Sequence, residues 1–499
     1  MPSTALPDIR RGWLLALALT VFAVAPLTYP GFFQARSGFL PVFRAEQTVN
    51  LSGGPVRGEG PLPYRLIGPP ARSAGGVAAV KIGYGIAFWL GALGVYAWTH
   101  RWLGSKGAVL AATLYTYLPW HLHTVYVRGA YAEAWLWAFW PWLFWSLDRL
   151  SGEEPGQVLA GVLVGLPTLA AVFWTQAGLA ALALPLLVSY GALVPARRLR
   201  AAALLLVPIP LWFVARRAAE APLPFADHFL YPFQLFSAAW GDEAFQLGVA
   251  AVGLTIVAVA VWAGRKPGPP LRSALRFWPI ALAVVVLLTL PPAAPFWRLT
   301  GLDALLTYPW QVLALSGLPL AFLGGAVTRL DERLAAPPLW AGLLALTILA
   351  GYPYLAPDFT QVDPGPAPVA LFRPVEADTP QIMLLQTDIE PPTILTPTLT
   401  LTLTWQAVAP VAGDYTVFIH ALDAEGRKIA QRDARPCDGD CPTDTWQPGK
   451  IIVDVHPLTL PPEAVDRVRQ LAVGLYLWQS GDRAAVSGRD DDTVILHVP

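Results

Sequence analysis

Long apolar runs, separated by short polar segments, dominate the first 356 residues of the chain. A helix needs roughly 20 apolar residues to cross the hydrocarbon core of a membrane. We therefore expect an α-helical polytopic membrane domain over residues 1–356. On this criterion the sequence predicts about eleven transmembrane helices, near residues 12–30, 76–98, 107–123, 131–147, 157–172, 174–193, 199–215, 246–263, 274–291, 308–327 and 337–354.

Two longer polar segments interrupt these runs, at residues 31–75 and 216–245. Loops of this length between packed helices commonly have a function of their own. Short segments such as THRWLGSKG, PARRLR and AGRKPGPPLR are basic, and the positive-inside rule places such segments in the cytoplasm. The same rule puts the N-terminus in the cytoplasm and both long loops outside. The first apolar run lacks a small-residue cleavage site, so we expect a retained anchor.

The periodicity changes in the last quarter of the chain. In LTLTLTWQAV, DYTVFIHALD, KIIVDVHPLTL and VRQLAVGLYLW, β-branched and aromatic residues largely alternate with others, and DAEG and QSGD are typical of hairpin turns. The pattern predicts an all-β sandwich of about eight strands over residues 375–499. Residues 357–374 then form a linker.

Composition and charge support this division. The chain is 55% hydrophobic and 14% charged, whereas soluble domains contain about 25% charged residues. Residues 1–356 hold 24 Lys and Arg against 14 Asp and Glu, whereas residues 357–499 hold 10 against 20. The 21 tryptophans and 50 prolines suit interfacial aromatic belts and interrupted membrane helices. The first region therefore fits a membrane, and the second fits water.

The two cysteines of the chain, Cys437 and Cys441, lie in the segment CDGDC. In an oxidising compartment this spacing favours a local disulfide, which would place the sandwich outside the cytoplasm. The alternative is a metal site, but two cysteines alone cannot complete a tetrahedral zinc shell. The sequence contains no Walker loop, dinucleotide-binding glycine pattern or HExxH motif. Nothing in it indicates nucleic-acid binding.

The segment LPWHLHTVYVRGAYAEAW, residues 118–135, places charges between two apolar runs. Glu133 lies just inside the outer end of a predicted membrane helix, where an ionisable side chain is costly and usually faces a cavity or a partner. The alternative for Glu133 is a structural one, in which the carboxylate favours the helix N-terminus and pairs with a local arginine. Both interpretations stay open at this point.

This segment and its continuation, YLPWHLHTVYVRGAYAEAWLWAFWPWLFW, resemble a motif of large bacterial membrane proteins with the C-type glycosyltransferase (GT-C) architecture. One branch of that superfamily is labelled pyruvoyl-tetrahydropterin-synthase-related membrane protein. PFQLFSAAWGDEAFQLG and LLTYPWQVLALSGLPLAFLGG resemble its second outer loop and a late Pro–Trp helix, and the sandwich is similar to C-terminal domains of some such transferases. The resemblance spans nearly the whole chain.

The resemblance implies a multi-pass glycosyltransferase of the bacterial cytoplasmic membrane. Its donor would be a sugar on a polyprenyl-phosphate carrier, and its acceptor a hydroxyl of a glycan, lipid or protein on the outer face. In the family the first outer loop often carries an Asp and a His, where this chain has Ser37 and Pro41. The alternative function is therefore a catalytically degenerate GT-C-like scaffold or glycan-binding partner subunit in cell-envelope assembly. A transporter is less favoured, because no inverted repeat with matched broken helices is evident.

Sugar transfer from a lipid phosphate requires a carboxylate that takes the acceptor proton. Glu133 is the first candidate for this catalytic base. Glu46, two residues after Arg44 in the first outer loop, is the second. The alternative for Glu46 is a solvated residue on an interfacial helix.

The departing phosphate requires a cation. Arg128 and Arg44 are the candidates, because the guanidinium fork matches phosphate geometry. Tyr126 and Lys81 complete the predicted substrate-binding set. Snorkelling of the cationic side chains to lipid headgroups is the alternative for each of them.

His121 and His123 could bind a metal or carry protons, but their i, i+2 spacing does not place both on one helical face. Asp227 and His228 form a weaker pair of the same kind. We therefore assign no metal ligands and no certain cofactor, although a divalent metal is compatible with phosphate chemistry.

Overall fold

The computed structural model describes residues 11–33, 35, 37, 40–42, 44–45, 60–194, 225–236, 246–265, 267–306, 308–360, 369–375, 377, 380–392, 397–448, 450–487 and 492–498. The predicted span at 199–215, most of the loop at 216–245 and the candidate Glu46 lie outside these residues. The chain divides into two compact units. We call them the helical unit (residues 1–29, 58–66 and 81–357) and the sandwich unit (residues 30–57, 67–80 and 358–499).

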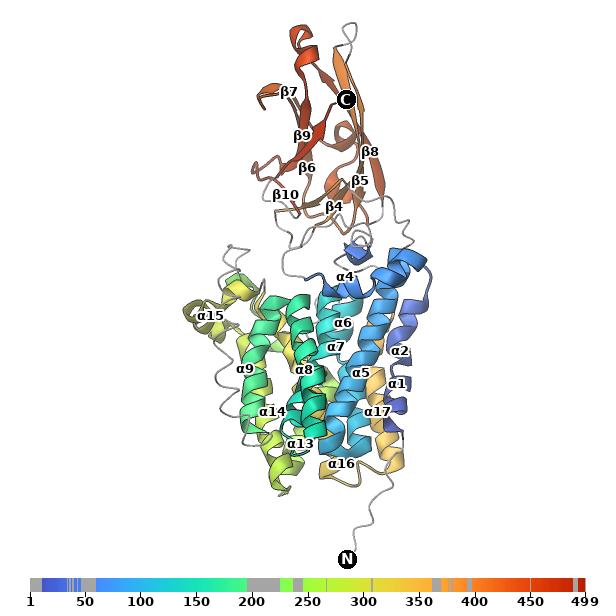
Figure 1. The fold of residues 1–499 in the computed structure, drawn as a ribbon, viewed down its shortest axis with the longest axis vertical. Helices are drawn as coiled ribbons and strands as arrows, with labels where there is room; N and C mark the ends of the chain where they lie inside the picture. Colours follow the sequence, from blue (N-terminus) through green and yellow to red (C-terminus); the bar gives the residue numbers. More distant parts are fainter. Residues whose placement is uncertain are drawn as a thin grey trace, which may run out of the picture. The chain divides into compact units, whose positions relative to one another are not determined.

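Helices of very different lengths make up the first part of the chain (Figure 1). The α-helices are α1 (Gly12–Ala18), α2 (Val21–Val24), α4 (Leu62–Leu66), α5 (Gly68–Tyr117), α6 (Pro119–Tyr126), α7 (Tyr131–Leu150), α8 (Pro155–Thr175), α9 (Ala177–Leu193), α12 (Pro232–Phe236), α13 (Val249–Ala263), α14 (Pro269–Leu288), α15 (Ala294–Thr300), α16 (Gly317–Leu330) and α17 (Pro337–Gly351). The 3-10 helices are η1 (Ala25–Thr28), η2 (Phe225–His228), η3 (Pro291–Ala293), η4 (Leu302–Leu305), η5 (Pro309–Ser316) and η6 (Tyr352–Leu355).

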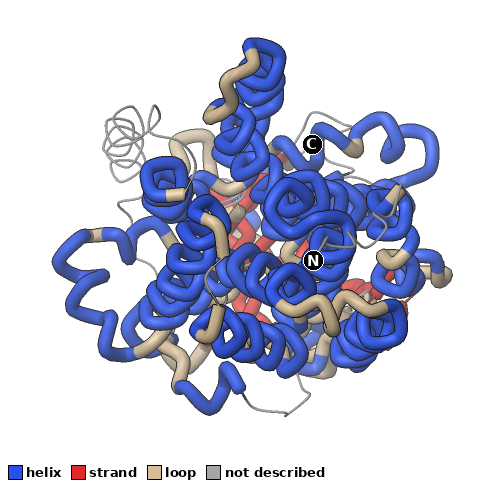
Figure 2. The backbone as a smooth tube through the Cα atoms, turned by 90° about the horizontal axis from the view of Figure 1, so that it is seen from below, coloured by secondary structure: helices blue, strands red, loops and turns tan. Residues whose placement is uncertain are grey.

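The helical unit has the character of a membrane domain, as the hydrophobic pattern predicts. Five helices among the described residues are long and apolar enough to cross a membrane: α5, α8, α14, η5 with α16, and α17 with η6. Shorter apolar helices lie at Gly12–Thr28, Ala177–Leu193 and Val249–Ala263. Figure 2 shows many of these helices end-on, packed side by side. The number of eleven spans stays a prediction.

The predicted spans at 76–98 and 107–123 fall largely within one element, α5, which reverses direction at Gly104. A Cβ atom placed on Gly91 would lie 3.5 Å from the ring of Tyr115. In a straight helix these two residues would be about 36 Å apart. Gly104 has a φ of 70°, in the left-handed region that glycine adopts without a Cβ clash. The expected loop THRWLGSKG is therefore a tight turn at a glycine.

The expected outer loop over residues 31–75 is partly helical, which corrects the sequence-based boundary. α4 and the first turns of α5 lie within it. Gly75, with a φ of 84°, separates those first turns from the apolar part of α5. The polar and proline-rich composition of this segment concealed a short helix whose buried residues include Pro63 and Tyr64.

The sandwich unit contains the predicted all-β fold in two antiparallel sheets (Figure 1). One sheet has the order β10-β3-β4-β5-β8 and the other β11-β9-β6-β7. A further pair joins β1 to β2. The strands are β1 (Phe32–Phe33), β2 (Phe359–Thr360), β3 (Ala370–Arg373), β4 (Ile382–Glu390), β5 (Thr398–Ala407), β6 (Tyr415–Leu422), β7 (Lys428–Ala434), β8 (Ile451–Thr459), β9 (Gln470–Leu477), β10 (Ala485–Val486) and β11 (Val494–His497).

The sheet begins earlier than the sequence analysis places it. β3 pairs with β4 although it lies in the segment assigned to the linker, so the boundary at residue 375 is wrong. The strand is only four residues long. A segment this short carries too little alternation to be recognised as a strand.

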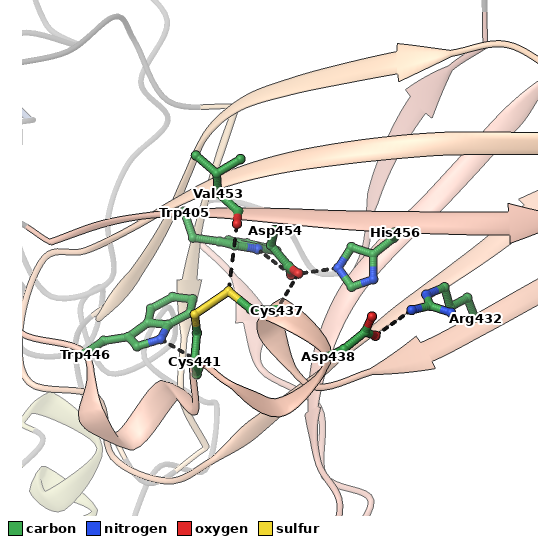
Figure 3. Close-up of polar contacts among 9 residues, drawn as sticks. All are labelled: Trp405, Arg432, Cys437, Asp438, Cys441, Trp446, Val453, Asp454 and His456. Atoms are coloured by element: carbon green, nitrogen blue, oxygen red, sulfur yellow. Dashed lines mark hydrogen bonds and ion pairs between the residues drawn. A yellow bond between two sulfur atoms is a disulfide. The ribbon is translucent and has the colours of Figure 1, made fainter.

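Alternating residues of the two main sheets fill a common apolar core, yet β8 directs two polar residues inward. Asp454 is fully buried and accepts hydrogen bonds from the Trp405 indole nitrogen (3.3 Å) and the Cys437 amide (2.8 Å) (Figure 3). The Nε2 atom of His456 lies 2.6 Å from the Asp454 carboxylate. Cys437 and Cys441 form a disulfide. Asp454 therefore anchors the disulfide loop to the core.

Candidate functional site

The candidate site is built at the turn between α6 and α7, where the charged segment of the sequence lies. α6 begins at Pro119, whose fixed φ and missing N–H suit the first helical position. It ends where the amides of Val127 and Arg128 both donate to the carbonyl of His123. Gly129 follows with a φ of 65°, and the chain then enters α7. The Arg-Gly-Ala sequence thus forms a helix end and a reversal.

Across this turn, Arg128 forms an ion pair with Glu133. The Nη1 atom of Arg128 donates to Oε2 of Glu133 at 2.8 Å, and the side chains are 13% and 2% exposed, respectively. Thr124 approaches the other carboxylate oxygen at 3.4 Å, a long hydrogen bond. Glu133 lies in the first turn of α7, where a negative charge also favours the helix dipole. The local pairing considered in the sequence analysis therefore exists.

Two tryptophans flank the same guanidinium group. The Cζ atom of Arg128 lies 5.2 Å from the ring of Trp120 on α6 and 4.7 Å from the ring of Trp310 on η5. The two indoles meet edge to face at 5.7 Å. A cation over an indole face is attracted by the ring quadrupole, more strongly where water is excluded. We call Arg128, Glu133, Thr124, Trp120 and Trp310 the arginine cage.

Two further aromatic side chains, Tyr308 and His228, continue from Trp310 of the arginine cage. Tyr308 stacks on Trp310 at 4.7 Å, and His228 meets Tyr308 edge-on at 4.7 Å. The side-chain oxygen of Gln311 accepts a hydrogen bond from the Tyr308 amide at 3.0 Å and so caps η5. The segment that carries Trp310 is therefore fixed locally. The side chain of Asp227 is not among those described.

Two other predicted binding residues, Tyr126 and Lys81, make hydrogen bonds to backbone carbonyl groups within the helical unit. The buried hydroxyl of Tyr126 donates to the carbonyl of Ala23, and the Lys81 ammonium group donates to the carbonyl of Tyr29. Arg44 is buried and belongs to the sandwich unit. Backbone contacts of this kind tie helices together.

The two histidines of the segment pack within the helical unit. His121 stacks on Trp137 at 4.3 Å, and its Nδ1 atom lies 3.0 Å from the carbonyl oxygen of Tyr115. His123 stacks on Trp120 at 5.2 Å. Among the described residues, no group of three or more His, Cys, Asp or Glu side chains could hold a metal ion.

A second buried carboxylate lies towards the opposite end of α7, about 22 Å from Glu133 along the helix. Asp148 is 3% exposed and accepts hydrogen bonds from the Trp102 indole (2.7 Å) and the Tyr190 hydroxyl (3.0 Å). The indole of Trp98 donates to the same hydroxyl at 3.2 Å. These contacts join α5, α7 and α9. Sequence reasoning missed this cluster, because its members come from three separate helices.

Sequence reasoning also missed Trp310, although the Pro–Trp step around it was the available signal. Nothing in the local pattern shows that this indole would reach Arg128. Only the packing of η5 beside α6 does so.

No family model and no curated protein sequence matches the chain. Among solved structures, it is similar to the Archaeoglobus fulgidus oligosaccharyltransferase tethered with an acceptor peptide, with 14% identity, a TM-score of 0.43, and 69% of this chain and 55% of that chain covered. It is also similar to ArnT from Cupriavidus metallidurans bound to undecaprenyl phosphate, with 14% identity, a TM-score of 0.37, and 68% and 63% covered. The chain spans less than two thirds of either protein. Both TM-scores are below 0.5, so the function rests on the chain's own residues.

Proposed function

We propose that the protein is an integral membrane glycosyltransferase with the GT-C architecture. It transfers a sugar from a polyprenyl-phosphate carrier to an acceptor hydroxyl of a glycan, lipid or protein on the outer face of the membrane. The observation that carries the proposal is the arginine cage, which holds a guanidinium group in one orientation at a turn between two apolar helices. The ordered sequence motifs around it support the same assignment.

Arg128 is suited to hold the carrier phosphate. Its contact with Glu133 uses one nitrogen, Nη1, whereas a guanidinium group presents five N–H donors. The remaining donors can meet phosphate oxygens while the ion pair persists. As the bond between the sugar C1 atom and the phosphate oxygen breaks, the negative charge on phosphate grows. A fixed cation in a surrounding with little water stabilises that charge without reorganising.

Glu133 fits a positioning role better than that of the catalytic base. Its carboxylate is buried and paired with the cation that the phosphate needs. The proton of the acceptor hydroxyl then passes to another carboxylate as the oxygen attacks C1. Glu46 in the first outer loop remains the candidate for that base. Arg44, Tyr126 and Lys81 remain secondary candidates, and the backbone contacts of the last two favour shaping the site over binding phosphate.

The cell location follows from the same proposal. We infer a bacterial cytoplasmic membrane with the N-terminus inside and the sandwich unit outside. The disulfide between Cys437 and Cys441 supports this topology, because disulfides persist in oxidising compartments. Protease treatment of intact spheroplasts should release sandwich fragments. Protection of the sandwich until the membrane is permeabilised would reverse the topology.

The test is transfer by the purified full-length protein from radiolabelled polyprenyl-phosphate sugars. We expect Arg128→Ala to abolish transfer and Glu133→Gln to reduce it. Arg149→Ala is the matched control, because Arg149 also stacks on a tryptophan, Trp145, but at the other end of α7. Full activity of Arg128→Ala would show that the arginine cage is not part of the active site. If the wild type transfers from no donor in a broad panel, the scaffold or partner-subunit alternative replaces the transferase.

A further inference from the structure

The outer face of the four-stranded sheet carries a strip of aromatic side chains that the apolar core does not use. Alternate residues of β6 and β9 fill the core, and the residues between them face outward. Phe418 lies on β6 and is 2% exposed, Tyr476 lies on β9 and is partly exposed, and Trp478 follows β9 directly. Trp478 is 67% exposed, so the face of its indole ring is available for a ligand to stack on.

The three rings follow one another in space, from Phe418 through Tyr476 to Trp478. The ring of Phe418 lies over Gly474 on the neighbouring strand, where a Cβ atom would come within 2.3 Å of the Phe418 ring. Ring centroids are 6.2 Å apart between Phe418 and Tyr476, and 6.3 Å apart between Tyr476 and Trp478. Glycine at position 474 therefore lets Phe418 lie flat, and the strip ends at the exposed indole.

Hydrogen-bonding groups border the strip. The guanidinium group of Arg483 covers Phe418 at 4.4 Å and pairs with Asp492 at 3.1 Å. The Tyr476 hydroxyl donates to Asp433 on β7 at 3.2 Å. His420 lies beside Phe418, with ring centroids 5.2 Å apart. Polar and charged side chains thus lie beside the accessible rings of Tyr476 and Trp478.

The charges at the strip cancel locally. Arg483 pairs with Asp492, and β7 carries the exposed Lys428, which donates to Gln431, together with Asp433, so these four formal charges sum to zero. A nucleic acid or a polyanionic glycan would require a surplus of positive charge. A stable protein partner would require an interface of about 800 Å² on each side, far more than the accessible rings of Tyr476 and Trp478 provide. The complementary ligand is small, uncharged, apolar on one face and rich in hydroxyl groups.

A pyranose ring has this chemistry, since its axial C–H groups form an apolar face and its equatorial hydroxyls point outward. We propose that Trp478 and Tyr476 form a binding platform for an uncharged glycan of hexopyranose units, with Asp433, Arg483 and His420 as hydroxyl partners. Sugar rings stack on Trp478 and Tyr476. This site does not depend on the transferase proposal, because it requires binding and no bond cleavage.

The experiment measures binding of uncharged hexasaccharides of glucose and of mannose to the full-length protein in detergent, by titration calorimetry. Trp478→Ala should weaken binding about tenfold or more, as for other central aromatic anchors, whereas Trp478→Phe should retain most of it. Val453→Ala is the control, because Val453 is 59% exposed on the other sheet.

The platform would be overturned by unchanged affinity of Trp478→Ala, by loss of affinity in Val453→Ala to the same degree, or by no binding of any uncharged hexasaccharide by the wild type. Binding confined to sulfated or uronate glycans would also overturn it, because the local charges would then have been misjudged. Thermal unfolding of each variant shows that the sandwich remains folded, which Trp478→Ala should not disturb because its side chain lies outside the core.

Discussion

The guanidinium carbon of Arg128, in the turn between α6 and α7, lies 4.7 Å from the ring centroid of Trp310 on η5, which is far away in the chain. Trp310 comes from a 3-10 helix whose first turn is capped by the side chain of Gln311. The contact completes the arginine cage. It turns a locally paired arginine into one with a fixed orientation.

Removal of Trp310 should therefore impair transfer more than folding. We expect Trp310→Ala to lower the rate by about tenfold or more, because small errors in the position of a catalytic group are costly, and Trp310→Phe to be milder. The measurement is transfer rate beside thermal unfolding in detergent. The control is Trp145→Ala, which removes the corresponding contact of Arg149. Equal losses in both variants would contradict an orienting role.

The ion pair between Arg128 and Glu133 should appear as a strong coupling in stability. Removing one partner of a buried pair commonly costs about 3–5 kcal/mol, and the residual exposure of Arg128 favours the lower end of that range. In a double-mutant cycle of Arg128→Met and Glu133→Gln, the double variant should be more stable than the sum of the single losses predicts. Strict additivity of the unfolding free energies would show that the pair contributes nothing.

Asp148 should be essential for stability at the other end of α7. Asp148→Ala leaves the donors of Trp102 and Tyr190 buried without their acceptor, at about 1–3 kcal/mol for each. Asp148→Asn keeps one acceptor oxygen and should cost less. Thermal unfolding in detergent checks the order of the variants, with the exposed Glu154→Ala as control. An alanine variant as stable as the wild type would mean that other groups satisfy both donors.

The disulfide should stabilise the sandwich modestly. Closing so short a loop removes about 2 kcal/mol of unfolded-chain entropy at 25 °C in the chain-entropy model. Cys437→Ser/Cys441→Ser should lower the unfolding free energy of the sandwich by about that amount and leave sugar transfer unchanged. Asp454→Asn, which weakens the anchor of the same loop, should add to the loss. No change on treatment of the wild type with reductant would contradict the stabilising role.

The sandwich should lose stability below neutral pH through His420. Partial burial lowers the pKa of His420, as do Lys428 and Arg483, while Asp433 raises it. The unfolded chain, with a histidine pKa of about 6.5, then binds the proton more readily than the folded one. This contribution is complete above pH 6.5 and is lost as the pH falls from there towards the folded pKa. His420→Gln should flatten the stability profile between pH 7.5 and 5, and an unchanged profile in this variant would contradict the assignment.

Apolar runs and alternation predicted the architecture because each reports a local periodicity. The split between α8 and α9 illustrates this: the predicted spans are 157–172 and 174–193, and the structure separates the two helices at Gln176. The start of the sandwich was placed too late, since the pairing of β3 with β4 is not visible in four residues. In the sequence the turn at Gly104 has the composition of a loop. Only the closeness of Gly91 and Tyr115 in space shows that the chain reverses direction there.

The sequence alone determined a membrane-type helical region, an all-β tail and the charged turn at Arg128 and Glu133, because composition and spacing fix which segments can bury themselves and where charges must lie. The tertiary structure alone decided what those charges meet. Trp310, the acceptor role of Asp148 and the strip ending at Trp478 each depend on side chains from separate elements. Such contacts arise from packing, which no local pattern encodes.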